Sequence, residues 1–243
     1  MLTCPALIMA GGKSERMRAG GCGTHKALRT VAGSTLLEQN LRALFRFQFK
    51  EITVAVNATE DELQHWLAAK GNEIAARANA RLHILLEDRP LGTIGAARSF
   101  ASSTENLIVV NVDNLTELDL GDLLEDHLRC KAALTVATHR QEFPIPFGQI
   151  DSVGSRVVAC REKQSIQATI SSGAYVLNRR AMLHIPEGRT QAPDLINTLV
   201  QAGELVHSYH HTSWWIDVND EAALQRAEAD LCAQSFSPLA RYA

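Results

Sequence analysis

The sequence predicts an α/β fold: a Rossmann-like, doubly wound mixed sheet that is mostly parallel and carries a small antiparallel part. As far as Thr138, short apolar runs typical of buried strands alternate with amphipathic runs of helical spacing. After that residue the pattern changes to short strand-like runs with little helix between them. The chain shows no repeats and no long linkers, which favours one continuous domain.

In the part of the chain up to Thr138, the spacing of apolar residues predicts whether each run is a strand or a helix. Leu37, Leu41 and Leu44 have the spacing of one helix face, and the acidic run Glu60–Glu62 suits a helix N-terminus. The expected strands are Ala6–Ala10, Ile52–Asn57, Arg81–Glu87, Asn106–Asp113 and Ala133–Thr138. The expected helices are Thr35–Phe47, Glu60–Ala69, Ala96–Ala101 and Leu120–Arg129, with a turn at Leu91–Gly95 before the third.

The later part supplies the antiparallel strands, which we expect to lie over one end of the sheet. These are Gly148–Asp151, Arg156–Arg161 and Gly173–Leu177. A helix at Pro193–Gln201, strands at Leu205–His210 and Trp214–Val218, and a helix at Glu221–Cys232 follow. Residues 1–234 are therefore expected to form a single domain, and residues 235–243 a C-terminal tail.

Composition limits the partners and the compartment. The formal net charge of −3 argues against binding of bulk nucleic acid, which needs a basic surface. The five cysteines are scattered and never form a CxxC pair, so a reducing, cytoplasmic setting is expected. The apolar run at Ala6–Ala10 is too short to span a membrane, and no basic segment of a signal peptide precedes it.

A glycine-rich, basic loop follows the first expected strand. It runs from Gly11 to Lys26, and its paired glycines let backbone N–H groups approach an anion closely. Arg16 offers a fork of donors for phosphate oxygens, and Lys26 offers a point charge. The loop is neither a Walker A loop nor GxGxxG. The spacing alone leaves two readings open, a phosphate site and a flexible surface loop.

Carboxylates end two later apolar runs. Asp113 closes one strand and is either a capping residue or a metal ligand, and Asp217 follows the apolar residues Trp214, Trp215 and Ile216. Asp119 and Asp122 fit a helix start better than a ligand set. The histidines show no metal spacing, and His207, His210 and His211 are expected at a surface or edge.

Several segments, taken in order, resemble the sugar-1-phosphate nucleotidyltransferases. Ala10–Met17 is similar to the signature AGGxGxRL, and His25–Leu28 to PKPL. Leu91–Ala96 is similar to LGTAGA, and Val109–Asp113 to a strand that ends in Gly-Asp. Arg161–Lys163 resembles xEK, Ser171–Val176 resembles NAGIYV, and Trp215–Val218 resembles the late W-x-D-I/V segment. The likeness covers nearly the whole chain and is strongest to the heptose- and mannose-1-phosphate guanylyltransferase branch.

The chain departs from these motifs at identifiable positions. Ser14 stands where the family has a third glycine, His25 where it has proline, and Val112 where it has glycine. Ser171 replaces the usual asparagine, and its hydroxyl reaches less far and lacks the paired donor and acceptor of an amide. The loop also carries an insert at Gly20–Gly23.

The resemblance implies roles for particular residues and a magnesium ion as cofactor. It implies Arg16, Lys26 and Asp113 as catalytic residues, and Asp113 with Asp217 as ligands of Mg²⁺. The residues implied for the nucleotide are Ala10, Gly11, Gly12, Glu87, Gly92 and Thr93. Those implied for the sugar phosphate are Glu162, Lys163, Ser172 and Gly173.

The expected reaction joins a nucleoside triphosphate to a sugar 1-phosphate and releases pyrophosphate. Glu87, just before the Gly92 turn, favours GTP, because a carboxylate can accept both adjacent donors of guanine. UTP or CTP as donor, a non-sugar acceptor, and a non-catalytic sugar-nucleotide sensor stay open as alternatives. A dinucleotide-binding oxidoreductase would need GxGxxG, which the chain lacks. A homo-oligomer is compatible with the sequence.

Overall fold

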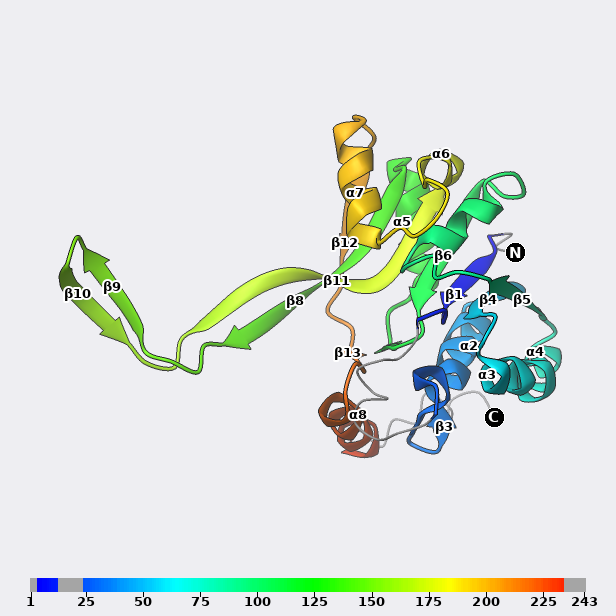
Figure 1. Cartoon of the computed structure of the whole chain (residues 1–243), viewed down its shortest axis with the longest axis horizontal. Coiled ribbons are helices and arrows are strands. Elements are labelled where there is room, and N and C mark those ends of the chain that lie inside the picture. The colour runs from blue at the N-terminus through cyan, green and yellow to red at the C-terminus, as the bar shows by residue number, and fades with distance from the viewer. Residues whose placement is uncertain (1–3, 13–23, 234–243) are drawn as a thin grey trace.

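A seven-stranded sheet forms the centre of the molecule (Figure 1). The computed structural model describes residues 4–12 and 24–233. The strands lie in the order β12 (Val206–His210), β8 (Leu134–Pro144), β11 (Ser165–Asn178), β6 (Asn106–Asn111), β1 (Ala6–Met9), β4 (Glu51–Asn57) and β5 (Arg81–Glu87). All neighbouring pairs are parallel except the two that involve β11. The predicted mixed, mostly parallel sheet is therefore confirmed.

Strand β11 corrects one expectation. The segment Gly173–Leu177 does not lie over an end of the sheet, because β11 is inserted between β6 and β8 and is antiparallel to both. Ala174–Leu177 is buried, as a strand with neighbours on both sides and layers on both faces must be. Periodicity identifies such a strand but not its neighbours, so its central place could not be read from the pattern.

The core forms two layers, one on each face of the sheet. Alternate residues of β1 point to opposite faces, so Ile8 packs in one layer and Leu7 in the other. The first layer contains α2 (Leu36–Arg46), whose Leu37, Leu41 and Leu44 are fully buried as their spacing predicts. The second layer contains α6 (Arg179–Leu183) and α7 (Ala192–Gln201).

The remaining helices follow the predicted order with altered bounds. They are α3 (Asp61–Trp66), α4 (Asn72–Arg77), α5 (Leu120–Cys130) and α8 (Glu221–Ala233). A π turn at Leu67–Gly71 joins α3 to α4, so the helical stretch expected to end at Ala69 continues to Arg77. Gly71 packs on β5, and a Cβ there would lie 2.8 Å from the end of the Leu82 side chain, which would have to shift. The segment expected as helix Ala96–Ala101 is a 3-10 helix, η3 (Gly95–Phe100).

Short elements connect the layers near the site. The turn η1 (Lys26–Leu28) precedes a small hairpin of β2 (Thr30–Val31) and β3 (Ser34–Thr35). Directly after β6, β7 (Asn114–Thr116) pairs in an antiparallel way with β13 (Trp215–Asp217). This pairing carries the late segment of the chain to the end of β6.

Beyond the sheet, β8 and β11 continue as a two-stranded ribbon that projects from the body (Figure 1). The ribbon leads to a hairpin of β9 (Gln149–Val153) and β10 (Arg156–Arg161). The strand expected to end at Thr138 therefore extends to Pro144, because Arg140–Pro144 finds a partner in β11. Within the described ranges, no helix combines the length and apolar character needed to cross a membrane.

Candidate active site

The candidate site lies at the carboxyl edge of the parallel strands, where ligands bind in open α/β sheets. Strand β1 pairs with β4 and β6, so the residues that follow Met9 and Asn111 leave the sheet side by side. Asn57 pairs with Glu87, which places the end of β5 at the same edge. The topology thus gathers three of the segments singled out in the sequence.

Lys26 and Asp113 form an ion pair at this edge. The Lys26 Nζ atom lies 2.6 Å from Asp113 Oδ2, and the two side chains are 20% and 13% exposed. A Cβ added to Gly12 would lie 3.9 Å from the same Nζ. The ammonium group therefore stands between the glycine backbone and the end of β6, where a phosphate could reach it.

His25 attaches the glycine loop to η1. Its Nδ1 accepts from the Ala27 N–H at 3.1 Å, so Nε2 carries the proton and donates to the Gly12 carbonyl at 3.0 Å. The ring is buried. The histidine that replaces proline thus positions Gly12 next to Lys26.

Glu87 lies beneath Gly11. Its side chain is 2% exposed, and a Cβ on Gly11 would fall 2.4 Å from its Oε2. That oxygen accepts from the Leu91 N–H at 3.2 Å. Burial raises the pKa of Glu87, and the Leu91 hydrogen bond partly opposes that rise. Glu87 therefore connects the glycine loop to the Gly92 turn.

Gly92 and Thr93 connect this turn to the segment before α7. Gly92 has φ +84°, and a Cβ there would lie 2.3 Å from the Thr190 carbonyl oxygen. The Thr93 hydroxyl accepts from the Ala192 N–H at 2.8 Å, at the start of α7. The close packing on Thr190 explains why residue 92 is glycine, and the hydrogen bond to Ala192 explains why residue 93 carries a hydroxyl.

Asp113 and Asp217, the expected metal ligands, are brought together by β7 and β13. Asp217 pairs with Asn114, and the Val218 N–H donates to the Asp113 carbonyl at 2.9 Å. Asn219 Nδ2 donates to Asp217 Oδ2. Two carboxylates on adjacent backbone positions form an all-oxygen donor set that fits Mg²⁺ when phosphate oxygens and waters complete the shell.

Ser172 and Gly173 lie beside the segments that carry these aspartates, because the Ser172 carbonyl accepts from Trp215 Nε1 and Gly173 packs on Asn114. Gly173, at φ +76°, occupies a bulge of β11, and a Cβ there would fall 2.0 Å from Asn114 Nδ2 and 3.1 Å from Asn111 Nδ2. The Ser171 hydroxyl donates to the Tyr175 hydroxyl at 2.9 Å. Asn111 and Asn114 were not singled out from the sequence, although two asparagines that flank Asp113 in an apolar strand were a usable signal.

A histidine pair and a tryptophan form the adjoining wall. The Ser172 hydroxyl donates to the Ala137 carbonyl at 3.0 Å and accepts from His211 Nε2 at 3.0 Å. The His139 ring lies 5.2 Å from that of His211 and 5.6 Å from that of Trp215. Burial, with the nearby His139 and His210, lowers the pKa of His211 to about 4. His211 therefore belongs to the wall of the site and not to a surface edge.

Glu162 and Lys163 are not brought to this edge. Both follow β10 on the projecting ribbon, and the Glu162 carboxylate lies near Gly148. Lys163 is exposed and has φ +53°. Arg16, Ser14 and the Gly20–Gly23 insert lie outside the described residues.

Comparison with known proteins identifies the family. A family model described as "Nucleotidyl transferase" matches residues 5–234. The chain belongs to the nucleotidyl transferase family. Mannose-1-phosphate guanylyltransferase of Mycobacterium tuberculosis is 28% identical, over 93% of this chain and 64% of its own length. D-glycero-alpha-D-manno-heptose 1-phosphate guanylyltransferase of Aneurinibacillus thermoaerophilus is 25% identical, over 72% and 74%.

A further curated protein and a solved structure extend the comparison. The bifunctional protein GlmU of Mycobacterium ulcerans is 24% identical over 93% of this chain but only 49% of its own length. The chain thus spans between about half and two thirds of the length of the first curated relatives that it matches. The crystal structure of HddC from Yersinia pseudotuberculosis complexed with GMP-PN has a TM-score of 0.73 at 19% identity, covering 94% of this chain and all of that one. At that identity the likeness shows the shared fold.

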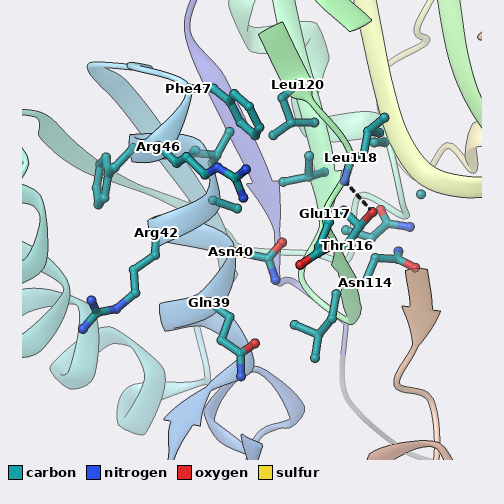
Figure 2. A pocket seen from close by; sticks show the side chains of 18 of the residues that line it. Gln39, Asn40, Arg42, Arg46, Phe47, Asn114, Thr116, Glu117, Leu118 and Leu120 are labelled. Carbon is teal, nitrogen blue, oxygen red and sulfur yellow. Dashed lines mark hydrogen bonds between the residues drawn. The ribbon is translucent and has the colours of Figure 1, made fainter. Parts of the chain in front are cut away.

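In the present protein, a cavity of about 980 Å³ adjoins the candidate site (Figure 2). Asn111, Asn114, Ser172 and Gly173 contribute to its lining. The opposite side of the cavity is lined by Arg42 and Arg46 of α2 and by Phe47, the residue that caps the C-terminal end of this helix. Of the four residues expected to contact the acceptor sugar phosphate, Ser172 and Gly173 therefore border a space large enough for a small ligand, whereas Glu162 and Lys163 do not.

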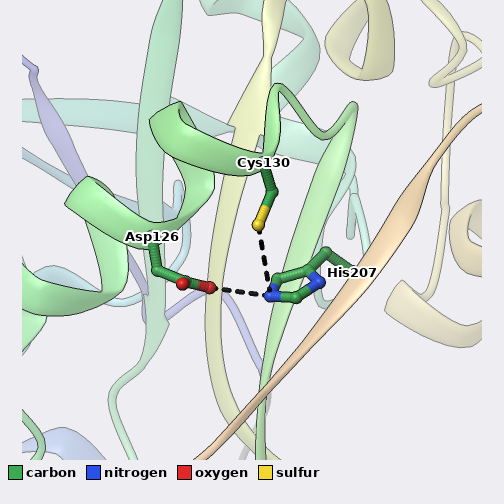
Figure 3. A group of neighbouring side chains, drawn as sticks. All are labelled: Asp126, Cys130 and His207. Atoms are coloured by element: carbon green, nitrogen blue, oxygen red, sulfur yellow. Dashed lines mark hydrogen bonds and ion pairs between the residues drawn. The ribbon is translucent and has the colours of Figure 1, made fainter.

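A second polar cluster joins α5 to the edge strand β12 (Figure 3). His207 Nε2 lies 2.7 Å from Asp126 Oδ2 and 3.8 Å from Cys130 Sγ. Arg129 also pairs with Asp126. Burial raises the pKa of that carboxyl, but the hydrogen bonds from His207 and Arg129 outweigh burial and lower it. The hydrogen bonds of this cluster link α5 to β12.

Proposed function

We propose that this protein is a sugar-1-phosphate guanylyltransferase, which joins GTP to a sugar 1-phosphate and releases pyrophosphate. The observation that carries the proposal is the Lys26–Asp113 ion pair beside Gly12, with Asp217 on the adjacent strand. A cation and two carboxylates at the carboxyl edge suit a triphosphate and its metal. The names of the mannose- and heptose-1-phosphate guanylyltransferase relatives support the acceptor class.

The reaction follows from the charges of the two substrates. An oxygen of the sugar phosphate forms a bond to the α-phosphorus of GTP, while the bond from that phosphorus to the bridging oxygen breaks and pyrophosphate leaves. The attacking phosphate is already ionised, so positioning and charge stabilisation supply most of the catalysis. Lys26 is suited to hold the α-phosphate, because its ammonium lies between Gly12 and Asp113. Arg16 is expected to neutralise the pyrophosphate.

Asp113 and Asp217 are the residues that would hold Mg²⁺. When bound, the ion would stabilise the negative charge of the phosphates. Chelation with EDTA should abolish pyrophosphate release, and added Mg²⁺ should restore it. Undiminished turnover in EDTA would remove the metal from the proposal.

Glu87 bears on the choice of base. Its Oε2 bonds the Leu91 N–H, whereas the buried Oε1 has no hydrogen-bond partner among the described residues. An unused carboxylate oxygen beneath Gly11 supports recognition of a base with N–H donors, as guanine has. The guanylyltransferase names of the relatives point the same way.

Pyrophosphate release tests the function. The full chain would be assayed with GTP, UTP, CTP and dTTP against a panel of hexose and heptose 1-phosphates. We expect release with GTP and a sugar 1-phosphate only when both are present. A clear preference for UTP would overturn the base assignment, and failure with every pair would overturn the activity.

A further inference from the structure

The projecting ribbon and its hairpin, residues 139–170, form what we call the arm (Figure 1). Its ladder runs without a break from the pair His139–Ile170 to the pair Pro144–Ser165. The Ile145 N–H then donates to the Gln164 carbonyl at 2.8 Å, and the hairpin of β9 and β10 follows. A two-stranded ribbon is marginally stable in water by itself, so an arm of this length calls for a covering surface.

The ribbon part of the arm is amphipathic. Residues that face each other across a ladder share one face of the ribbon. One face carries the apolar Phe143, Ile166, Ala168 and Ile170 together with Gln141 and His139. The other face carries Arg140, Glu142, Pro144, Ser165, Gln167 and Thr169. On the apolar face Phe143 and Ile166 are 46% and 57% exposed. This alternation is typical of a strand pair with one covered face, and the described part of this chain provides no cover.

The hairpin repeats the pattern. Ile150 lies opposite Cys160, and Ser152 lies opposite Val157, so both pairs share one face. Ile150 and Val157 are more than half exposed. The opposite face carries an ion pair between Asp151 and Arg161. The arm therefore presents apolar side chains along its whole length.

At its base, the apolar face of the arm runs into the candidate site. His139 lies on that face, opposite Ile170, and its ring contacts Trp215. Trp215 precedes Asp217 by two residues on β13. A partner that covered this face would therefore also lie next to the entrance of the site.

We propose that a second copy of this chain covers the arm in a two-fold dimer, and that the arm delivers Lys163 to the candidate site of that copy. The arm contains enough residues for one side of a stable interface, which uses about 20–30. A two-fold contact uses the same surface twice, so each arm crosses to the other body and both apolar faces are covered at once. The Lys163 part rests on the proposed function.

The arm holds Lys163 away from the site of its own chain. Strand β11 alone separates Ser165 from Ser172 by about 23 Å at the usual rise per residue. Lys163 lies two residues further out, beyond the reach of its side chain. The ladder has no break between the pair His139–Ile170 and the pair Pro144–Ser165, so the ribbon does not fold back between those pairs. A cation at the outer end of the arm is placed for a neighbouring molecule.

Sedimentation velocity of the full chain tests the interface. The wild-type protein should sediment as a dimer at micromolar concentration. The double variant Ile150→Asp/Val157→Asp should sediment as a monomer, because two charges would be buried in the contact. Val200→Asp is the matched control, since Val200 is 59% exposed on α7 of the body. A monomeric wild-type protein, or a dimeric arm variant, would overturn the proposal.

A crosslinking experiment locates Lys163 without reference to activity. A photo-reactive residue at position 163 would be activated in a mixture of isotopically heavy and light copies. The expected product joins a heavy arm to light peptides that contain Asp113, Ser172 or Trp215. Links confined to one copy, or links to another surface, would overturn the placement. The outcome is independent of any assay of pyrophosphate release.

Mixed dimers test the role of Lys163 in the reaction. Lys163→Asn suits the left-handed backbone at this position, and Asp113→Asn disables the site. Each variant would carry its own affinity tag, so that purification through both tags yields mixed dimers. In a mixed dimer the site with an intact Asp113 receives Lys163 from the other copy, and the second site lacks both residues. About half of the wild-type activity per dimer is therefore expected from the two-fold symmetry. No recovery, or full activity of Lys163→Asn alone, would overturn delivery by the partner. If wild-type dimers form and crosslink as stated but release no pyrophosphate, the proposed function fails and the arm contact stands.

Discussion

The α-carbon of Gly11 packs so closely on Glu87 that a methyl group there would lie 2.4 Å from Oε2 of the carboxylate. The contact joins the glycine loop to the strand that precedes the Gly92 turn. Glu87 is buried, so it has little freedom to move aside. The neighbouring Gly12 has no such contact, because a methyl group on it would lie 3.9 Å from Lys26 Nζ, its nearest neighbour among the described atoms.

Gly11→Ala should therefore destabilise the protein, whereas Gly12→Ala should not. Overpacking of this kind costs about 1–3 kcal/mol. Urea unfolding of the two variants measures the difference. The double variant Gly11→Ala/Glu87→Ala should be less destabilised than the sum of its single changes, because removing the carboxylate makes room for the methyl group. Additive effects of the two changes would contradict the contact.

Asp113→Asn should leave the fold intact and lower kcat by roughly 100-fold or more, as loss of a central electrostatic group does. The amide keeps the shape but no longer pairs with the charge of Lys26 or holds a divalent cation. Asp122→Asn on α5 is the control, because that residue is exposed and lies in the first turn of a helix. Circular dichroism and pyrophosphate release are the measurements. Near-normal turnover of the Asp113 variant would remove it from the catalytic machinery.

Gly173→Ala should raise the KM for the sugar phosphate more than the KM for GTP. The new methyl group would displace Asn114, whose Nδ2 lies 2.0 Å from the position that the added Cβ would take. The positive φ adds strain of about 1–2 kcal/mol. Gly203→Ala separates the two effects, because Gly203 has φ +74° with no atom within 4 Å of a Cβ. Equal kinetic changes in both variants would mean that strain alone is responsible.

His127 should make stability fall in acid. Its ring is 1% exposed and bonds the Thr135 hydroxyl at 2.8 Å, and burial lowers its pKa from 6.5 to about 4. Between these two pH values the unfolded chain binds a proton that the folded chain does not. The free energy of unfolding is thus reduced as pH falls through this window, by on the order of 3 kcal/mol at its lower end.

Urea unfolding between pH 7 and 4 checks this dependence. His127→Asn should show a shallower loss of stability than the wild-type protein. His65→Asn, an exposed residue of α3, should follow the wild-type curve. Parallel curves for the His127 variant and the wild type would show that the buried imidazole is not the titrating group.

Local patterns predicted most elements near their observed bounds. Arg81–Glu87 is a strand with the predicted ends, and the leucines of α2 are buried as their spacing requires. Periodicity depends on the two faces of each element, which neighbouring residues determine. The position of β11 and the length of β8 depend on which strands pair, and pairing partners leave no mark in a local pattern.

By itself the sequence determined the α/β class, the order of the motifs and the residue types on which the proposed phosphate site depends. Those properties depend on composition and on spacing along the chain. Only the tertiary structure decided that Asp217 meets Asp113 across β7 and β13, that Glu87 lies beneath Gly11, and that Lys163 stands on an arm. Contacts between residues distant in sequence depend on strand pairing and packing, which are properties of the whole fold.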